Sequence, residues 1–228
     1  MSYYPGKIND EYIKEYIEKI IPEEKNNFIN EMRLYAIEKN VPIIEKETEK
    51  MLEVLIKTSK VNSILEVGTA IGYSGIVFSR AMNYKGKIKS FEINEEIHEI
   101  AKKNIKDYKE SLNIDFDIEL VLSDAKTGLE NEEGFYDLIF IDAAKGHYQK
   151  FYDQIENNLK NGSIIVSDNV LFKGMIATDK YVIKRKKTIV KRMRSYIDFL
   201  MNNPLLTTTV IPIGDGVAIS YYTGGENE

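Results

Sequence analysis

The stretch from Ile64 to Ser74, ILEVGTAIGYS, restricts the possible folds more than any other part of the chain. An apolar run reaches Glu66, a turn of small residues follows, and a helical pattern begins at Ser74. Glycine permits a tight turn, and the first turn of a helix presents backbone N–H groups without helical partners. This arrangement brings backbone close to a nucleotide-like ligand. The alternative is a connection without a ligand, and the dinucleotide fingerprint G-x-G-x-x-G is absent, because the turn reads G-x-A-x-G.

From residue 63 onward, apolar runs typical of strands alternate with segments of helical periodicity. The strand candidates are residues 63–67, 87–92, 118–122, 136–142, 163–167, 207–213 and 216–222. The helix candidates are residues 74–82, 95–108, 148–159 and 179–201. Strands separated by helices predict a parallel sheet with helices on both faces. The link between the last two strands, residues 214–216, is too short for a crossover and predicts an antiparallel hairpin. The expected fold is therefore α/β, a Rossmann-like doubly wound sheet of seven strands with the last strand antiparallel.

Residues 1–60 show helical periodicity that is interrupted at Pro22 and at Pro42. They predict extra N-terminal helices, which would cap a cofactor, form a dimer face or simply cover the sheet. With 228 residues, the chain favours a single domain over residues 1–228. We expect a disordered tail at 224–228.

Composition excludes several classes of protein. The chain contains no cysteine, which excludes disulfides, thiolate nucleophiles and cysteine-bound metals. No apolar run approaches the roughly 18–20 residues that cross a bilayer, and the N-terminus lacks the apolar core of a signal peptide. The net charge of −5 argues against a uniformly basic coat for nucleic acid. We expect a cytoplasmic protein without a membrane partner.

Acidic residues follow two strands at positions where an open α/β sheet contacts a nucleotide. Glu92 ends the second strand, twenty residues after Gly72, where it would accept hydrogen bonds from ribose hydroxyls. Its alternative role is that of a surface glutamate in an acidic stretch. The pair Asp124-Ala125 follows the third strand, at the position that would contact an adenine ring.

Two carboxylates and an amide follow the next two strands. Asp142 ends the fourth strand, Asp168 and Asn169 end the fifth, and Lys145 lies three residues after Asp142. Because the carboxyl ends of neighbouring parallel strands meet at one edge of a sheet, we expect these side chains to converge. A set of ligands that contains only oxygen suits a hard divalent cation such as Mg²⁺, whereas zinc sites usually contain Cys or a pair of His residues. Each aspartate singly has the alternative role of a turn or strand-end residue.

Three segments together resemble one enzyme family. LEVGTAIGYS, FIDAAKGHY and SDNVLFKG are similar to motifs of the cation-dependent class I S-adenosylmethionine (AdoMet) O-methyltransferases of the catechol and caffeoyl-CoA type, over residues 30–222. The resemblance implies AdoMet and Mg²⁺ as cofactors. It implies catalytic roles for Lys145, as the base, and Asp142, and metal ligands at Asp142, Asp168 and Asn169. It further implies cofactor contacts at Ile44, Glu66, Gly68, Ser74, Glu92, Ala125 and Asp142.

These residue types fit methyl transfer to oxygen. The reaction is an in-line displacement that needs an oxyanion, and a bound Mg²⁺ lowers the pKa of a coordinated hydroxyl and orients it. Lys145 would take the proton if burial beside a dication lowers its own pKa. His147 is a rival base that we interpret as a rim or structural residue. We expect His98, in a helix rich in charge, to be solvated.

A basic segment follows Asn169. Between positions 173 and 194, the sequence contains nine Lys and Arg residues and only one acidic residue, Asp179. This asymmetry favours a phosphate-binding surface beside the active site, and the alternative is a solvated helix face. The candidate phosphate contacts are Lys173, Arg185, Lys186, Lys187, Arg192 and Arg194.

Charge alone does not separate coenzyme A from RNA as the source of phosphate. VLFKG, the basic segment and VIPIGDGVAIS resemble the bacterial branch that methylates 5-hydroxyuridine at the tRNA wobble position, so the resemblance implies tRNA as the substrate. The alternative acceptor is a small catechol or a phenolic CoA ester. An NAD-dependent oxidoreductase would want the full glycine fingerprint, and a non-catalytic RNA-binding module would leave the strand-end carboxylates unexplained. We expect a homodimer.

Overall fold

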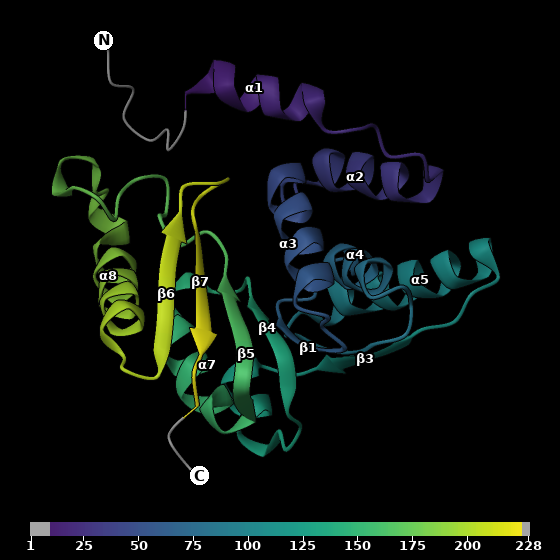
Figure 1. Ribbon diagram of the computed structural model, residues 1–228. Coiled ribbons are helices and arrows are strands. Elements are labelled where there is room, and N and C mark those ends of the chain that lie inside the picture. Colours follow the sequence, from purple (N-terminus) through teal and green to yellow (C-terminus); the bar gives the residue numbers. More distant parts are fainter. Residues whose placement is uncertain (1–9, 225–228) are drawn as a thin grey trace. The chain divides into compact units, whose positions relative to one another are not determined.

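The computed structural model describes residues 10–224, so most of the predicted tail at 224–228 and the first nine residues of the N-terminal layer lie outside the described residues. The strands are β1 (Ser63–Val67), β2 (Lys87–Glu92), β3 (Asp117–Leu122), β4 (Tyr136–Ile141), β5 (Leu159–Ser167), β6 (Leu206–Ile211) and β7 (Val217–Tyr222). The α-helices are α1 (Glu11–Ile20), α2 (Asn27–Lys39), α3 (Lys46–Thr58), α4 (Tyr73–Ala81), α5 (Glu95–Leu112), α6 (Ala125–Gly128), α7 (Tyr148–Ile155) and α8 (Lys187–Asn202) (Figure 1). Short 3-10 turns lie between several of them.

The strands form one mixed sheet of seven strands in the order β3-β2-β1-β4-β5-β7-β6. Strands β1, β2 and β3 pair in parallel, as do β4 and β5. Strand β7 runs antiparallel to both β5 and β6. The expected doubly wound fold with an antiparallel last strand is therefore confirmed.

The chain forms two compact units, which we describe separately. One comprises residues 17–128, and the other comprises the described parts of residues 1–16 and 129–228. In the first unit every residue of β1 is buried, and so is nearly all of α4. Glycine lets this helix lie close to the sheet, because a Cβ on Gly75 would be 2.8 Å from Cδ1 of Ile118 on β3.

In the second unit, helix α8 lies along strand β6 (Figure 1). It buries an apolar face made of Val190, Met193, Tyr196 and Leu200, at the spacing expected for one side of a helix. The hydroxyl of Tyr196 lies 2.7 Å from the hydroxyl of Ser167 at the end of β5. This contact secures the buried polar groups at the point where β5 leads into the predicted site.

The predicted helix over residues 179–201 is wrong at its beginning. Residues 179–181 and 184–186 form two 3-10 turns, and α8 begins only at Lys187. Val182 and Ile183 are extended, with ψ of 115° and 132°. Both are β-branched residues, which lose side-chain freedom in a helix. The cations of residues 184–186 therefore precede the helix instead of lying along it.

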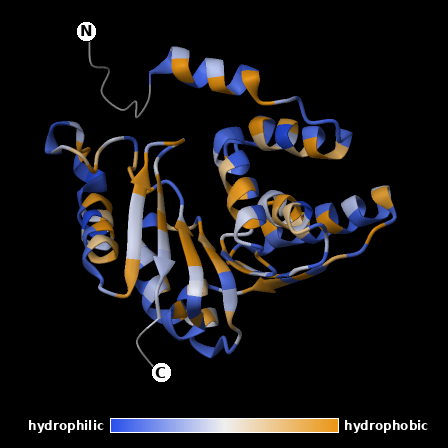
Figure 2. Ribbon diagram, viewed as in Figure 1, coloured by the Kyte–Doolittle hydropathy of each residue, from blue (hydrophilic) through white to orange (hydrophobic). Residues whose placement is uncertain are grey.

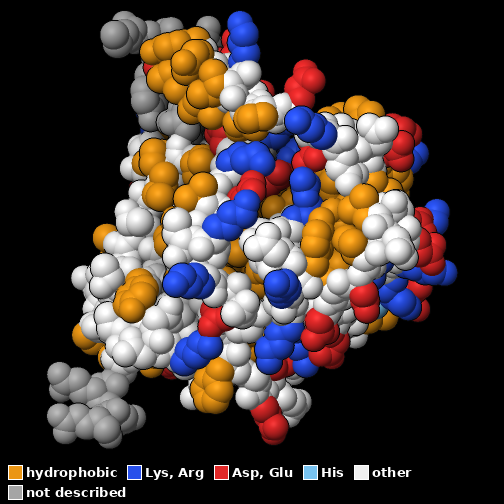
Figure 3. Space-filling view, turned by 45° about the vertical axis from the view of Figure 1, so that its right-hand side comes forward, with side chains coloured by type: hydrophobic (Ala, Val, Ile, Leu, Met, Phe, Trp, Pro, Cys, Tyr) orange, Lys and Arg blue, Asp and Glu red, His pale blue; other side chains and the backbone are white. Residues whose placement is uncertain are grey.

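Helix α1 has an apolar side that the rest of the described chain leaves uncovered. None of its residues is buried, and Tyr12, Tyr16 and Ile20 are exposed. Orange and blue alternate along its ribbon in Figure 2, and apolar side chains gather at its height, at the top of Figure 3. The homodimer stays a prediction. No helix in the described residues is long and apolar enough to cross a membrane.

Candidate active site

The glycine turn after β1 is held against the end of β2. The backbone N–H groups of Gly68 and Thr69 both donate to the carbonyl oxygen of Phe91, at 3.0 and 3.2 Å. Gly68 and Gly72 have φ of 110° and 81°, values that favour glycine. A Cβ on Gly72 would also lie 3.2 Å from Cδ1 of Ile105. The turn therefore delivers the beginning of α4 in the arrangement that binds a nucleotide-like group.

Glu66 lies fully buried beneath this turn. One of its carboxylate oxygens accepts a hydrogen bond from the hydroxyl of Ser74, and the other accepts one from the hydroxyl of Ser90. A buried carboxylate requires such partners, because desolvation of an unpaired charge costs several kcal/mol. Of the predicted cofactor residues, Glu66 and Ser74 thus bind each other, which fixes the first turn of α4 to the sheet.

Glu92 stands at the end of β2 and accepts backbone hydrogen bonds. Its Oε2 accepts from the N–H of Ala70 at 3.0 Å, and its Oε1 accepts from Ile93 at 3.0 Å and Asn94 at 2.9 Å. The carboxylate is therefore fixed beside the glycine turn, which is where a ribose-binding acid is needed. Sequence reasoning did not find its second role, which is to bind the turn itself.

The remaining predicted cofactor residues lie on other segments. Ile44 is buried in the link before α3, and Ala125 is buried as the first residue of α6. These two residues lie in the unit of residues 17–128, together with Glu66, Gly68, Ser74 and Glu92. Asp142 belongs to the other unit.

The predicted metal and catalytic residues come together at the ends of β4 and β5. The pairing of Ile141 with Ser167 places the residues that follow, Asp142 and Asp168, next to each other. Asn169 Nδ2 lies 3.3 Å from Asp142 Oδ1, and the N–H of Asn169 donates to Asp168 Oδ1 at 2.6 Å. The hydroxyl of Tyr148 donates to the backbone carbonyl of Asp168 at 2.9 Å.

This donor set fits a hard cation. It offers two carboxylates, and a half-turn of the Asn169 amide would direct its oxygen to the position that Nδ2 holds beside Asp142. The described residues contain no group of three or more His, Cys, Asp and Glu side chains that could hold a metal. A metal here would therefore depend on the amide as its third protein ligand.

Lys145 lies in a 3-10 turn that begins three residues after Asp142. Burial lowers the pKa of Lys145, an effect opposed by the carboxylates of Asp142, Asp215 and Asp168. Burial raises the pKa of Asp142, an effect opposed by Lys145. An amine with a lowered pKa is suited to accept a proton from an acceptor hydroxyl.

A bent loop borders Lys145. Asn169, Phe172 and Lys173 have φ of 60°, 46° and 55°, and such left-handed residues store backbone strain near functional sites. The loop is bound to the turn between β6 and β7, since the N–H of Leu171 donates to the carbonyl of Asp215 at 2.9 Å and the N–H of Lys173 donates to the Asp215 carboxylate. Sequence reasoning missed Asp215, although the Gly-Asp-Gly turn at 214–216 was the available signal.

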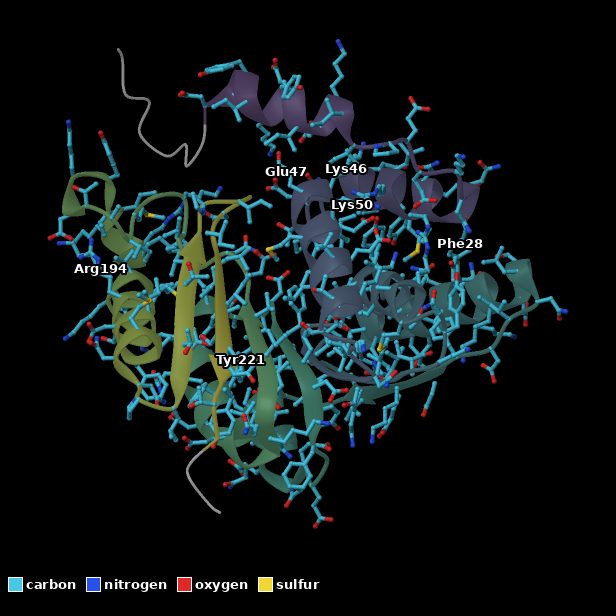
Figure 4. The ribbon with its side chains drawn as sticks, viewed as in Figure 1. Phe28, Lys46, Glu47, Lys50, Arg194 and Tyr221 are labelled. Atoms are coloured by element: carbon cyan, nitrogen blue, oxygen red, sulfur yellow. The ribbon has the colours of Figure 1, made fainter. Side chains whose placement is uncertain are left out.

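The basic residues differ in what they contact. Arg194, labelled in Figure 4, is engaged within its own segment through Asp179 at 2.6 Å and the carbonyls of Ile176 and Met175 at 2.9 and 3.1 Å. Arg192 donates to the carbonyl of Gly146 at 3.3 Å. Lys186 Nζ lies 5.7 Å from the centre of the Phe172 ring, which Lys145 approaches to 6.0 Å. Lys173, Arg185 and Lys187 are exposed.

Neither of the two histidines is among the predicted metal ligands. His147 directly precedes α7, half-buried, with its ring centre 6.3 Å from that of Phe151. The prediction that His98 is solvated is wrong, because its side chain is buried against the rest of the unit and only 5% exposed. The sequence pattern missed it because the residue lies on the inner face of an otherwise charged helix.

Comparison with known proteins identifies the family. The model of a family described as O-methyltransferase matches residues 18–222. The chain is 31% identical to a proposed caffeoyl-CoA O-methyltransferase from Staphylococcus aureus, with a TM-score of 0.83 over 93% of this chain and 100% of that one. It is 28% identical over 189 residues to the caffeoyl-CoA O-methyltransferase of Medicago sativa, covering 79% of this chain and 74% of that protein. An O-methyltransferase from Bacillus cereus solved with SAH shares the fold, at 23% identity and a TM-score of 0.78 over 92% of this chain and 97% of that one.

From the match over residues 18–222, together with the seven-stranded sheet and its strand-end residues, it follows that this protein is an enzyme of the O-methyltransferase family.

Proposed function

We propose that the enzyme transfers the methyl group of AdoMet to the hydroxyl of a small catechol or of a phenolic CoA ester. The observation that carries this proposal is the position of Lys145. Burial lowers the pKa of Lys145, and its amine interacts electrostatically with the carboxylates of Asp142 and Asp168. The relatives named caffeoyl-CoA O-methyltransferases support the class of acceptor. Structures of family members solved with SAH or SAM support AdoMet as the donor.

The glycine turn of the first unit would hold the donor. The N–H groups at the beginning of α4 suit the polar end of AdoMet, and Glu92 suits the ribose hydroxyls. Both features are fixed in advance, because Glu66 binds the first turn of α4 and Glu92 binds the backbone of the glycine turn. A site fixed before the ligand arrives loses less conformational entropy on binding.

The residues at the ends of β4 and β5 would handle the acceptor. Lys145 removes the proton of the acceptor hydroxyl, and the resulting oxyanion attacks the methyl carbon while the bond from that carbon to sulfur breaks. Asp142, Asp168 and Asn169 would hold Mg²⁺ or another hard divalent cation, which when bound lowers the pKa of the acceptor hydroxyl. Alignment of the oxygen with the methyl group supplies a further part of the acceleration.

A second candidate acceptor is 5-hydroxyuridine at the tRNA wobble position. The observation in its favour is the group of cations at residues 184–187, which immediately precedes and begins α8, where the first turn contains no acidic residue. Cations at a helix N-terminus are opposed by the helix dipole, typically by about 0.3–1 kcal/mol each. A segment that keeps exposed cations such as Arg185 and Lys187 at this position fits an anionic partner.

One assay separates the two acceptors. The enzyme is incubated with AdoMet, Mg²⁺ and either caffeoyl-CoA or tRNA that contains 5-hydroxyuridine, and the products are identified by mass spectrometry. Methylation of caffeoyl-CoA alone supports the main proposal, whereas methylation of tRNA alone overturns it in favour of the second.

A charge variant tests the cations themselves. Replacing Arg185, Lys186 and Lys187 with Gln should weaken tRNA binding and flatten its salt dependence. Each lost phosphate contact removes nearly one unit of the log–log slope for a duplex and somewhat less for a single strand. Replacing Lys102, Lys103 and Lys106 on α5 with Gln removes the same charge elsewhere and serves as the matched control. Equal effects of the two triple variants would contradict a specific role for residues 185–187.

A further inference from the structure

Helix α4, whose beginning forms the cofactor turn, is bound at both ends to the N-terminal segment. At its first residue, the hydroxyl of Tyr73 donates to Glu49 Oε2 on α3 at 2.6 Å. Near its last residue, Arg80 Nη1 lies 2.8 Å from Glu24 Oε2, just ahead of α2. The two contacts are of similar chemistry, but only the first lies beside the residues expected to receive AdoMet.

The contact at Tyr73 is part of a group of three side chains, of which Tyr73 and Glu49 are buried and Arg33 is half-buried. Arg33 on α2 donates to the same Oε2 of Glu49, and its guanidinium carbon lies 4.8 Å from the centre of the Tyr73 ring. Glu49 is only 5% exposed. The next residue, Lys50, which is labelled in Figure 4, places its Nζ 3.8 Å from Glu49 Oε1. Burial, and then the nearby charge of Glu49, raise the pKa of Tyr73, so the phenol keeps its proton and acts as donor.

The position of Tyr73 connects this group to the cofactor turn. Tyr73 directly follows Gly72, the residue that caps α4, and Ser74 is held from the sheet by Glu66. Two consecutive residues at the beginning of α4 are therefore held by two carboxylates, Glu49 from α3 and Glu66 from β1. The direction of the first N–H groups of α4 depends on both.

We infer that Glu49 is a positioning residue for AdoMet binding, which acts through Tyr73 and couples helices α2 and α3 to the cofactor turn. The inference rests on the proposed AdoMet site. It gives the N-terminal helices a part in cofactor binding in addition to covering the fold. By linkage, AdoMet binding stabilises the docking of α2 and α3 to the same degree that this docking favours AdoMet.

The variants that test this are Glu49→Gln and Tyr73→Phe, with Glu24→Gln as the matched control. Glu24→Gln weakens the other bond between the N-terminal segment and α4, while its side chain keeps an oxygen for the N–H of Asn26. A residue that merely stabilises the fold would lower Tm in all three variants without distinguishing them in cofactor affinity. Tyr73→Phe removes one hydroxyl only, so it covers the case in which Glu49→Gln fails to fold.

The first measurement is the Kd for AdoMet, obtained by calorimetric titration. The second is the rate of hydrogen exchange in α2 and α3 with and without AdoMet. We expect Glu49→Gln and Tyr73→Phe each to raise the Kd for AdoMet about tenfold, the effect of losing a hydrogen bond to a charged group. We expect the double variant to be little worse than either single one, because both break the same interaction. Glu24→Gln should leave Kd within about twofold. In wild type, AdoMet should slow exchange in α2 and α3, and in Glu49→Gln it should not.

Two results would overturn the inference. A wild-type protein that does not bind AdoMet would remove the proposed cofactor site and the coupling together. A wild-type protein that binds AdoMet, with Kd unchanged in Tyr73→Phe or changed equally in Glu24→Gln, would overturn the coupling alone.

Discussion

Asn169 and Asp142, 27 residues apart in sequence, meet at the ends of two neighbouring strands, with Asn169 Nδ2 3.3 Å from Asp142 Oδ1. The parallel pairing of β4 and β5 makes this contact, because it brings the last residues of both strands to one edge. The left-handed backbone of Asn169, at a φ of 60°, then turns its amide toward the aspartate. The register between β4 and β5 thus determines that the donor side chains meet.

Removal of the cation should stop methyl transfer. In excess EDTA, activity should fall to background and return on addition of Mg²⁺. Without the cation, the acceptor hydroxyl lacks the nearby positive charge that lowers its pKa. Asp168→Ala should have the same effect on activity while AdoMet binding is retained, and Asp153→Ala, on the exposed side of α7, should be neutral. Initial rates and calorimetric binding are the measurements, and full activity in EDTA would refute the metal site.

Loss of the Glu92 carboxylate should weaken the binding of AdoMet. Glu92→Ala removes the expected acceptor for the ribose hydroxyls and also the acceptor for the Ala70 N–H, so we expect a loss of about 1–3 kcal/mol in binding. Glu96→Ala, an exposed acid on α5, is the control. Equal Kd values in the two variants, measured by calorimetry, would show that Glu92 only supports the turn.

Glu53 should make stability depend on acid pH. Hydrogen bonds from Lys50 and Lys57 lower the pKa of Glu53 from 4.5 to about 2. A carboxyl with a depressed folded-state pKa contributes stability that is fully present above its unfolded value and is lost as pH falls through the folded one. The difference in Tm between wild type and Glu53→Gln should therefore shrink between pH 4.5 and 2. A difference that does not change over this window would argue against the two lysine contacts.

Local sequence patterns predicted the elements whose limits are marked locally. Strand β1 lies where the apolar run of residues 63–67 placed it, because a glycine turn ends it. The predicted beginning of helix α8 was wrong, because the extended residues Val182 and Ile183 interrupt a segment whose other residues favour a helix. The prediction that His98 is solvated was wrong, because burial of a residue on a charged helix depends on which side of that helix faces the sheet.

Long-range contacts could not be predicted in this way. The bond from Tyr73 to Glu49 joins residues 24 apart, and the bond from Lys173 to Asp215 joins residues 42 apart. No periodicity or spacing connects such pairs, since each depends on how whole elements pack. The strand-end set was predictable because parallel strands bring their carboxyl ends together whatever lies between them.

The most direct test of the account is single-turnover transfer of a radiolabelled methyl group from AdoMet to caffeoyl-CoA by wild type, Lys145→Met and Lys150→Met. Lys150 lies exposed on α7, five residues after Lys145, so its variant removes an equal charge outside the site. We expect wild type and Lys150→Met to transfer the label at similar rates, and Lys145→Met to be slower by about 10²–10⁴-fold, the usual contribution of a general base. AdoMet affinity should be the same in all three. Transfer by Lys145→Met at the wild-type rate would contradict the role of Lys145 as the base.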